Sequence, residues 1–150
     1  MIDYLDQLRS EIKRAEHLFY VSLKYTRTVD VIRSVIERFM NAYDVGIESL
    51  LVKVAKRRKT LEVPEQPRKK CEVAKEVFAD NEEIVKHIDF YLKLRDIFQA
   101  KYEASHEYRR NVTMTSMLQP GEVLEVNIDL LEEYFEKTKK FAQLVVEKIS

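Results

Sequence analysis

Apolar residues recur at steps of three and four along most of this chain, which is the spacing of one face of an α-helix. The first such stripe predicts a helix over residues 3–25, with the Asp3 side chain as its N-cap. A longer and wider stripe predicts a second helix over about 28–60 that touches two neighbours. Gly46 lies within this second stripe, and a glycine inside a helix indicates a close helix crossing or a bend.

The connection after the second helix contains Pro64 and Pro67. Residues that precede a proline are biased away from the helical conformation, so this segment is predicted to be a loop. We expect a short helix over 68–79, with Pro67 at or next to its first position. A third stripe predicts a long helix over 81–118, which Pro120 must end.

The last part of the chain combines a turn signal with a helix start. Pro120 followed by Gly121 suits the central pair of a type II turn. Residues 122–126 are expected to be briefly extended. Asn127 is then expected to cap a final helix, whose apolar stripe continues to Ile149.

These segments predict an all-α fold: one domain over residues 1–150, built as an antiparallel up-and-down bundle of four long helices plus one short helix. Only two glycines and three prolines punctuate the chain, which is too few turn residues for a β-sandwich or an α/β fold. The helices over 28–60 and 81–118 are expected to be longer than the other two. Their protruding ends would expose apolar surface, so we expect a homodimer.

Composition and charge exclude several classes of protein. The 26 basic and 26 acidic residues cancel, which argues against a protein that coats nucleic acid with its whole surface. The single cysteine, Cys71, excludes an intramolecular disulfide and a multi-cysteine zinc site. No apolar run approaches the roughly 20 residues of a membrane span, and the N-terminus does not resemble a signal peptide. We expect a cytoplasmic protein with no membrane partner, no cofactor and no metal. The heavy use of Glu, Lys and Arg is typical of thermophilic proteins.

Basic residues concentrate on both sides of the predicted loop. Residues 53–70 hold eight basic and two acidic side chains. The predicted basic patch consists of Lys53, Lys56, Arg57, Arg58, Lys59, Arg68, Lys69 and Lys70. Such a patch could hold a phosphate backbone. Cations at the end of a helix also suit the helix dipole, and a solvated hairpin is the more common meaning of such a run.

The stretch from 102 to 116 carries the most side chains suited to chemistry. Polar residues interrupt its stripe at positions that should face inward on a helix. The candidate ligand-binding residues are His106, Arg109, Arg110, Asn111 and Thr115. Glu103 and His106 also have the Glu-x-x-His spacing of di-iron bundles, but this spacing occurs once and does not assemble a complete site.

The run from Arg110 to Thr115 resembles the signature of HEPN domains, in which an arginine, often followed by an asparagine, stands before three further residues and a histidine. Arg110 and Asn111 match this signature, whereas Thr115 occupies the histidine position. The resemblance covers the chain from about Val29 to the C-terminus and implies a helical bundle that often dimerises near the motif. Active members of the family are metal-independent ribonucleases in which the arginine and the histidine serve the scissile phosphate.

The resemblance therefore implies a module that binds RNA, a nucleotide or a protein partner through the Arg110–Asn111 region. Many HEPN-like proteins pair with a nucleotidyltransferase, which is the protein partner to expect. Thr115 cannot transfer protons near neutral pH, so catalysis is not expected. His106, one helical turn before Arg110, could substitute. The alternative is a helical scaffold for self-association or partner docking, with no ligand site, in which internal hydrogen bonds occupy Arg110 and Asn111 instead of leaving them in an open cleft.

Overall fold

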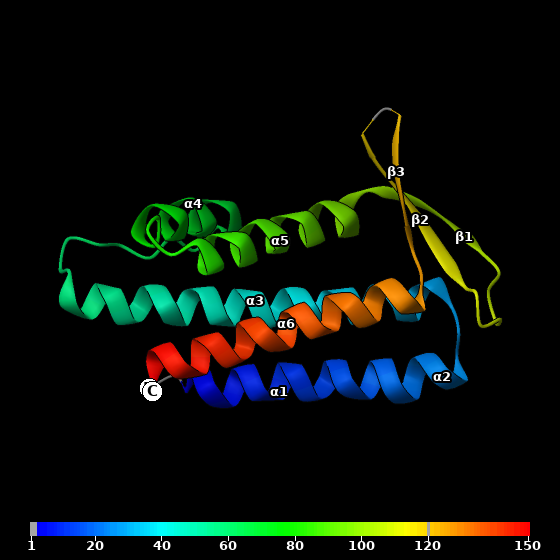
Figure 1. Ribbon diagram of the computed structural model, residues 1–150, viewed down its shortest axis with the longest axis horizontal. Helices are drawn as coiled ribbons and strands as arrows, with labels where there is room; N and C mark the ends of the chain where they lie inside the picture. Colours follow the sequence, from blue (N-terminus) through cyan, green and yellow to red (C-terminus); the bar gives the residue numbers. More distant parts are fainter. Residues whose placement is uncertain (1–2, 120) are drawn as a thin grey trace.

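The computed structural model describes residues 3–119 and 121–150 and is a helical bundle with a small sheet at one end (Figure 1). The helical segments are α1 (Tyr4–His17), η1 (Leu18–Ser22), α2 (Leu23–Tyr25), α3 (Val29–Arg57), α4 (Pro67–Val77), α5 (Glu82–Gln99) and α6 (Ile128–Ile149). The strands are β1 (Lys101–Ser105), β2 (Thr113–Gln119) and β3 (Glu122–Val126). The segment η1 is a π-helical turn that joins α1 to α2. Within the described part of the chain, every helix is too short or too polar to cross a membrane.

Side-chain caps set the helix starts. The side chains of Asp3, Thr28 and Asn127 cap α1, α3 and α6, and each accepts a hydrogen bond of 2.9–3.3 Å from the backbone N–H three residues later. Asn81 caps α5 in the same way, at 3.1 Å. The helices predicted outside residues 81–118 are therefore confirmed to within a few residues at each end.

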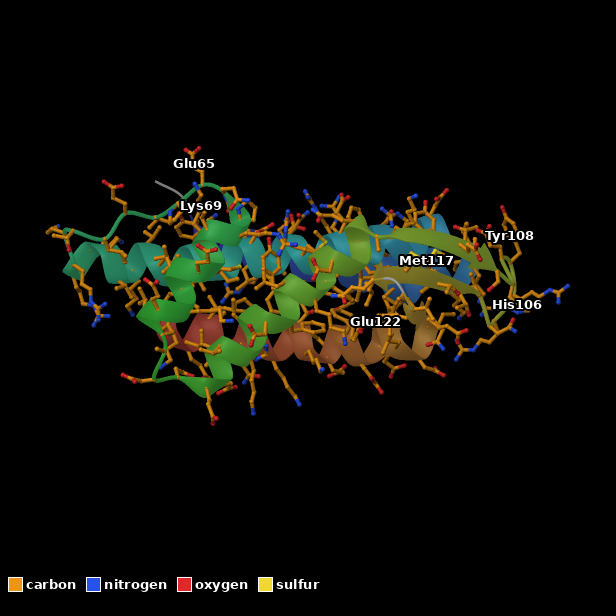
Figure 2. All side chains as sticks on the ribbon, turned by 90° about the horizontal axis from the view of Figure 1, so that it is seen from above. Glu65, Lys69, His106, Tyr108, Met117 and Glu122 are labelled. Carbon is orange, nitrogen blue, oxygen red and sulfur yellow. The ribbon has the colours of Figure 1, made fainter. Side chains whose placement is uncertain are left out.

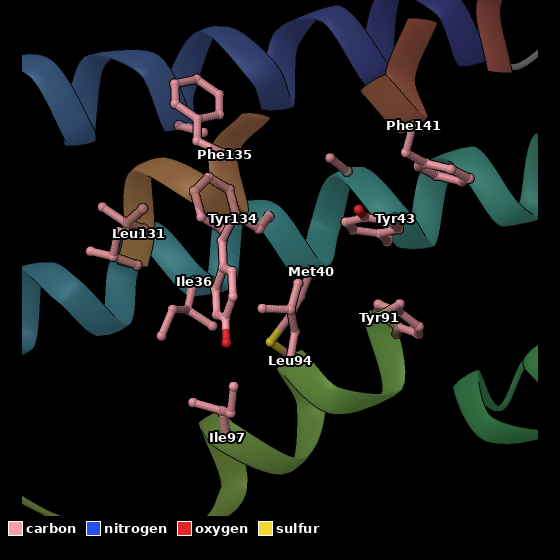
Figure 3. Close-up of a cluster of buried hydrophobic side chains, with 14 of the residues drawn as sticks. Ile36, Met40, Tyr43, Tyr91, Leu94, Ile97, Leu131, Tyr134, Phe135 and Phe141 are labelled. Atoms are coloured by element: carbon pink, nitrogen blue, oxygen red, sulfur yellow. The ribbon is translucent and has the colours of Figure 1, made fainter. Parts of the chain in front are cut away.

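The helix α3 is the centre of the molecule, because α1, α4, α5 and α6 all pack against it. Phe39 of α3 stacks on Phe135 of α6 with ring centroids 5.5 Å apart, and Tyr43 stacks on Phe141 at 4.5 Å. Figure 3 shows the labelled aromatic rings in the space between the helices. A Cβ atom on Gly46 would lie 2.5 Å from the Phe141 ring. Of the two alternatives expected at Gly46, a close helix crossing or a bend, the structure shows the close crossing.

The helix predicted over 81–118 is wrong in its second half. The helix α5 ends at Gln99, and the chain then forms a three-stranded antiparallel sheet in the order β1-β2-β3. Met114 of β2 lies opposite Val126 of β3 in the register of this sheet. The fold is therefore predominantly helical rather than purely all-α.

The sheet forms because alternate residues of β2 bury their side chains against the end of the bundle. Met114 and Ser116 are fully buried, whereas Thr113 and Thr115 are partly exposed. This is the two-residue period of a strand, and β-branched residues such as threonine favour strands. Met114 and its partner Val126 belong to the same hydrophobic core as the helices. Burial of this alternating face therefore outweighs the helical composition of the segment.

The corrected boundaries change the expectation about helix length. The helix α5 spans 18 residues and α6 spans 22. The prediction that α5 is the longer of the two and protrudes beyond its neighbour is therefore wrong. The homodimer stays a prediction without that argument. The extended run predicted over 122–126 is confirmed as β3. Gly121 has a φ of +83°, as the third residue of a type II turn requires, whereas Pro120 lies outside the described residues.

Candidate functional site

The loop between β1 and β2, residues 106–112, presents most of the predicted site residues at one end of the molecule. His106 and Tyr108 adopt left-handed backbone conformations, with φ of 55° and 66°. These two residues let the chain reverse without a glycine. Every residue from 101 to 111 is exposed. Figure 2 shows His106 and Tyr108 at the tip of this end, far from Lys69.

Two hydrogen bonds hold this loop on the connection between α2 and α3. The backbone N–H of Tyr108 donates to the carbonyl oxygen of Arg27 at 2.6 Å. The Glu107 carboxylate accepts a hydrogen bond from the backbone N–H of Val29 at 3.0 Å. Val29 is the first residue of α3, so Glu107 supplies an anion where the helix dipole favours one. The loop is therefore anchored to the helical bundle.

Arg110 lies where two shallow pockets meet. The first, of about 180 Å³, is lined by Arg110, Asn111, Thr113, Asn127, Ile128 and Asp129. The second, of about 250 Å³, also contains Arg110 and Ile128, together with Tyr20, Lys24, Arg27 and Glu132. The two acidic residues, Asp129 and Glu132, offset part of the positive charge. Arg110 itself is exposed, so it is not the buried arginine of the scaffold alternative.

Four exposed tyrosines lie in this loop or in the segments next to it: Tyr108 in the loop, Tyr102 on β1, and Tyr20 and Tyr25 in the segment that ends at Arg27. Tyr25 and Tyr108 have 79% and 77% of their surface accessible, and Tyr20 and Tyr102 have 52% and 41%. Exposed large apolar groups that gather in one place mark interaction sites more often than isolated ones. We define the hairpin-end surface as these four tyrosines and the four cations beside them: Tyr20, Tyr25, Tyr102, Tyr108, Lys24, Arg27, Arg109 and Arg110.

Arg33 of α3 supports the ring of Tyr102 from one side. The guanidinium carbon of Arg33 lies 4.4 Å from the Tyr102 ring centroid and 4.3 Å from that of Phe98. One guanidinium nitrogen also donates to the backbone carbonyl of Phe98 at 3.0 Å. A cation placed over an aromatic face is attracted to it, so Arg33 fixes the orientation of both rings. Tyr102 is thus a positioned ring rather than a freely rotating one.

The structure brings four of the five predicted ligand-binding residues together on the loop: His106, Arg109, Arg110 and Asn111. The fifth, Thr115, lies on β2 between Glu103 of β1 and Glu125 of β3. The one-turn spacing expected between His106 and Arg110 does not apply, because both residues lie in a loop and not on a helix.

The predicted basic patch lies at the other end of α3, away from the hairpin-end surface (Figure 1). Seven of its eight residues are exposed. Lys70 does not belong to the exposed patch, because it is only 8% exposed and its Nζ lies 3.2 Å from Glu48 Oε1. Arg68 pairs with Asp96 at 2.7 Å. These partners come from α3 and α5, so the sequence around 68–70 could not indicate them.

Sequence reasoning missed the contribution of residues 20–27 to the site. Tyr20 and Tyr25 fall outside the apolar stripe of the first helix, and that position was the available signal that their rings are exposed. Lys24 and Arg27 accompany them in the same short segment. Their proximity to the loop around Tyr108 results from tertiary contacts alone.

A second group of titratable side chains lies between α3, α4 and α5. Asp44 accepts a hydrogen bond from the Tyr91 hydroxyl, which accepts one from Arg95 Nη1 at 3.3 Å. Burial raises the pKa of Asp44 and of Tyr91, and it raises the pKa of the Cys71 thiol to about 11. The hydrogen bonds link Asp44, Tyr91 and Arg95 in a row, although the buried Nε of Arg95 has no partner, and the row lies beside the ion pair that joins α4 to α3. We therefore assign them to the packing of α4.

No family model, curated protein or solved structure matches this chain. The HEPN-like resemblance consequently stays a prediction. Over residues 3–119 and 121–150, His, Cys, Asp and Glu side chains do not gather in groups of three or more that could hold a metal ion.

Proposed function

We propose that this protein binds single-stranded RNA through the hairpin-end surface, without cleaving it. The observation that supports the proposal is the gathering of four exposed tyrosines among Arg27, Arg109 and Arg110 at one end of the bundle. Aromatic rings interleaved with cations form the usual platform for an unpaired strand.

The tyrosines provide the stacking part of such a platform. Unpaired RNA bases stack on aromatic side chains, at roughly 1–3 kcal/mol per base. The contact between Tyr108 N–H and the Arg27 carbonyl places the loop next to the segment that carries Tyr25. Tyr25 and Tyr108 are the two most exposed large apolar side chains of the described residues. Tyr102, braced by Arg33, offers a third ring.

The cations provide the contacts to phosphate. Arginine matches phosphate geometry with two parallel N–H donors. Each phosphate contact also makes the affinity fall more steeply as the salt concentration rises. Arg110 lies between the two pockets and adjoins Lys24 and Arg27. The Glu107 carboxylate is engaged with the Val29 backbone N–H, whereas Asp129 and Glu132 line the same pockets as Arg110 and offset part of this positive charge.

The sequence motif is the reason for proposing RNA as the ligand and for proposing binding without cleavage. Arg110 and Asn111 match the HEPN signature of a family whose active members act on RNA, which supports RNA as the ligand. Thr115 stands in the position of the proton-transferring histidine. A hydroxyl does not exchange protons near neutral pH, so the proposal involves binding alone.

The test is fluorescence anisotropy with a labelled oligouridine. We expect Tyr25→Ala and Tyr108→Ala each to weaken binding by roughly 5- to 150-fold, which is the equivalent of about 1–3 kcal/mol. Tyr25→Phe and Tyr108→Phe are the matched controls, since they keep the stacking ring and lose only the hydroxyl.

Three outcomes of this experiment decide the proposal. Loss of binding in the alanine variants with retention in the phenylalanine variants supports stacking. Equal affinity of all four variants and the unchanged protein contradicts it. The double variant Lys56→Ala/Arg57→Ala, in the basic patch at the far end of α3, should bind normally. A large loss there would move the binding site to that patch.

A second candidate function is self-association through β1. This strand is an edge of the sheet and all five of its residues are exposed. An exposed edge presents unpaired backbone donors and acceptors that can pair with another strand. We propose an antiparallel β1–β1 homodimer as this alternative. Sedimentation showing a clean monomer at micromolar concentration rejects it, and a dimer that Ala104→Lys dissociates supports it, because lysines on an edge discourage pairing.

A further inference from the structure

A stripe of exposed residues runs along the outer face of the N-terminal helix toward the hairpin-end surface. Its members recur every four residues: Arg9, Lys13, His17, Val21 and Tyr25. Residues four apart are neighbours on a helix surface. The stripe therefore begins with two cations and a histidine and ends at Tyr25, which already belongs to the hairpin-end surface.

The π-helical turn η1 keeps this stripe continuous. In a regular α-helix a four-residue repeat drifts around the axis, because one turn holds 3.6 residues. The backbone N–H of Leu23 bonds to the carbonyl of Leu18, five residues earlier. This extra residue in the turn offsets the drift. Single π-turns of this kind often occur at functional sites.

A groove accompanies the cationic half of the stripe. It has a volume of about 850 Å³, and its lining includes Arg9, Lys13, Arg14 and His17 from the first helix and Arg38 from α3. We call these five residues the α1 track. The lining of this groove comes from α1, η1 and α3.

Acidic groups near the α1 track neutralise part of it. Glu11 lies 3.5 Å from Arg14 and 3.4 Å from Arg38, so its carboxylate is shared between these two arginines. Asp6 also lines the groove. Arg9 and Lys13 form none of the salt bridges found in the described part of the chain. These two cations therefore contribute positive charge to the groove, and the carboxylates of Asp6 and Asp3 offset part of it near Arg9.

We infer that the α1 track holds the phosphates of the same strand whose bases stack on the hairpin-end surface. This inference rests on the proposed function and extends it: the ligand is a strand longer than the tyrosine platform, and it follows α1 away from the loop. Charge complementarity selects a polyanion for the groove, and the shared stripe ending at Tyr25 gives the strand one unbroken path.

The test compares oligouridines of about 5 and about 15 nucleotides, which span the site sizes common for single-strand binders. The variant is Arg9→Ala/Lys13→Ala. The matched control is Lys86→Ala/Lys140→Ala, which removes two exposed lysines from α5 and α6. Circular dichroism and thermal melting establish that both variants are folded.

We expect the unchanged protein and the control to bind the 15-mer at least tenfold more tightly than Arg9→Ala/Lys13→Ala does, with equal affinity of all three for the 5-mer. The slope of log K against log salt for the 15-mer should fall by roughly 1.4 in the variant, since each lost phosphate contact removes about 0.7 on single strands. Because a long strand offers a short site several registers, the comparison between variant and control is the decisive one.

The remaining outcomes overturn the inference in distinguishable ways. If the 5-mer binds but the variant and the control bind the 15-mer equally well, the α1 track is not part of the path and the proposed function stands. If neither oligomer binds the unchanged protein, the proposed function fails, and the inference fails with it.

Discussion

Glu107 and Val29 are joined by a 3.0 Å hydrogen bond between the Glu107 carboxylate and the Val29 backbone N–H. The contact ties a loop of the sheet to the first turn of the central helix. The same turn is capped by Thr28, whose hydroxyl oxygen accepts from Val31 N–H at 3.3 Å. The start of α3 is thus stabilised by Thr28, which is next to it in sequence, and by Glu107, which is distant in sequence.

Glu107→Ala should lower the free energy of unfolding by an amount typical of a lost helix cap, about 0.5–2 kcal/mol. It should also weaken RNA binding, because it loosens the loop that carries Tyr108 and Arg110. Glu107→Gln is the control, since its amide oxygen still accepts the hydrogen bond. Chemical denaturation and anisotropy measure the two effects, and an alanine variant as stable as the unchanged protein would show that the contact contributes nothing.

Arg110→Ala should separate binding from folding. Arg110 is exposed, and exposed substitutions usually change stability by no more than about 0.5 kcal/mol. RNA binding should nevertheless weaken, and Arg110→Lys should recover only part of it because lysine lacks the two-pronged donor geometry. Thermal melting and anisotropy on the same samples provide the check. A large drop in melting temperature, with no RNA binding by the unchanged protein, would sink the binding proposal.

Gly46→Ala should destabilise the protein by about 1–3 kcal/mol, the range for overpacking a core. The new Cβ would lie 2.5 Å from Phe141 Cε2, and that ring is fully buried and stacked on Tyr43. This penalty exceeds the gain of about 1 kcal/mol in helix propensity.

The double variant Gly46→Ala/Phe141→Leu is the control for this effect. A double-mutant cycle should return a favourable coupling, because the smaller side chain leaves room for the methyl group. A single variant more stable than the unchanged protein would mean that α3 and α6 separate easily at this crossing.

Asp44→Asn should change the pH dependence of stability. Burial, the largest effect, raises the pKa of Asp44 above its ordinary value of 3.8, although the hydrogen bond from Tyr91 and the charges of Lys70 and Arg95 oppose it. Between 3.8 and the raised pKa the folded state binds the proton more tightly than the unfolded state. The contribution of Asp44 therefore lowers the free energy of unfolding as pH rises through that window.

We expect Asp44→Asn to match or exceed the unchanged protein in stability at neutral pH. The difference should shrink as pH falls below 3.8, where Asp44 is protonated in both states. Denaturation curves across this range measure the difference. Glu147→Gln, exposed on α6, is the control and should show no such trend. A variant that is less stable at neutral pH and recovers on acidification would reverse the sign assigned to Asp44.

The sequence by itself determined most of the helices. Apolar spacing and the predicted caps Asp3 and Asn127 are local signals, because each depends on residues within one or two turns. Gly46 indicated either a close helix crossing or a bend, since glycine within a helix is unfavourable without a structural reason; the packing of α6 decided for the crossing. The sequence also placed Arg109, Arg110 and Asn111 together, since they are adjacent in the chain.

The tertiary structure alone decided the sheet and the composition of the candidate site. The turn at His106 and Tyr108 contains no glycine or proline, so no local signal stops the helix before it. Burial of Met114 against the bundle, available only once the helices have packed, selects the strand. The contacts of Glu107 and Tyr108 with the start of α3 then bring Tyr25 beside the loop. Such contacts join residues far apart in sequence, and their free energy exists only in the folded chain, so spacing along the chain could not reveal them.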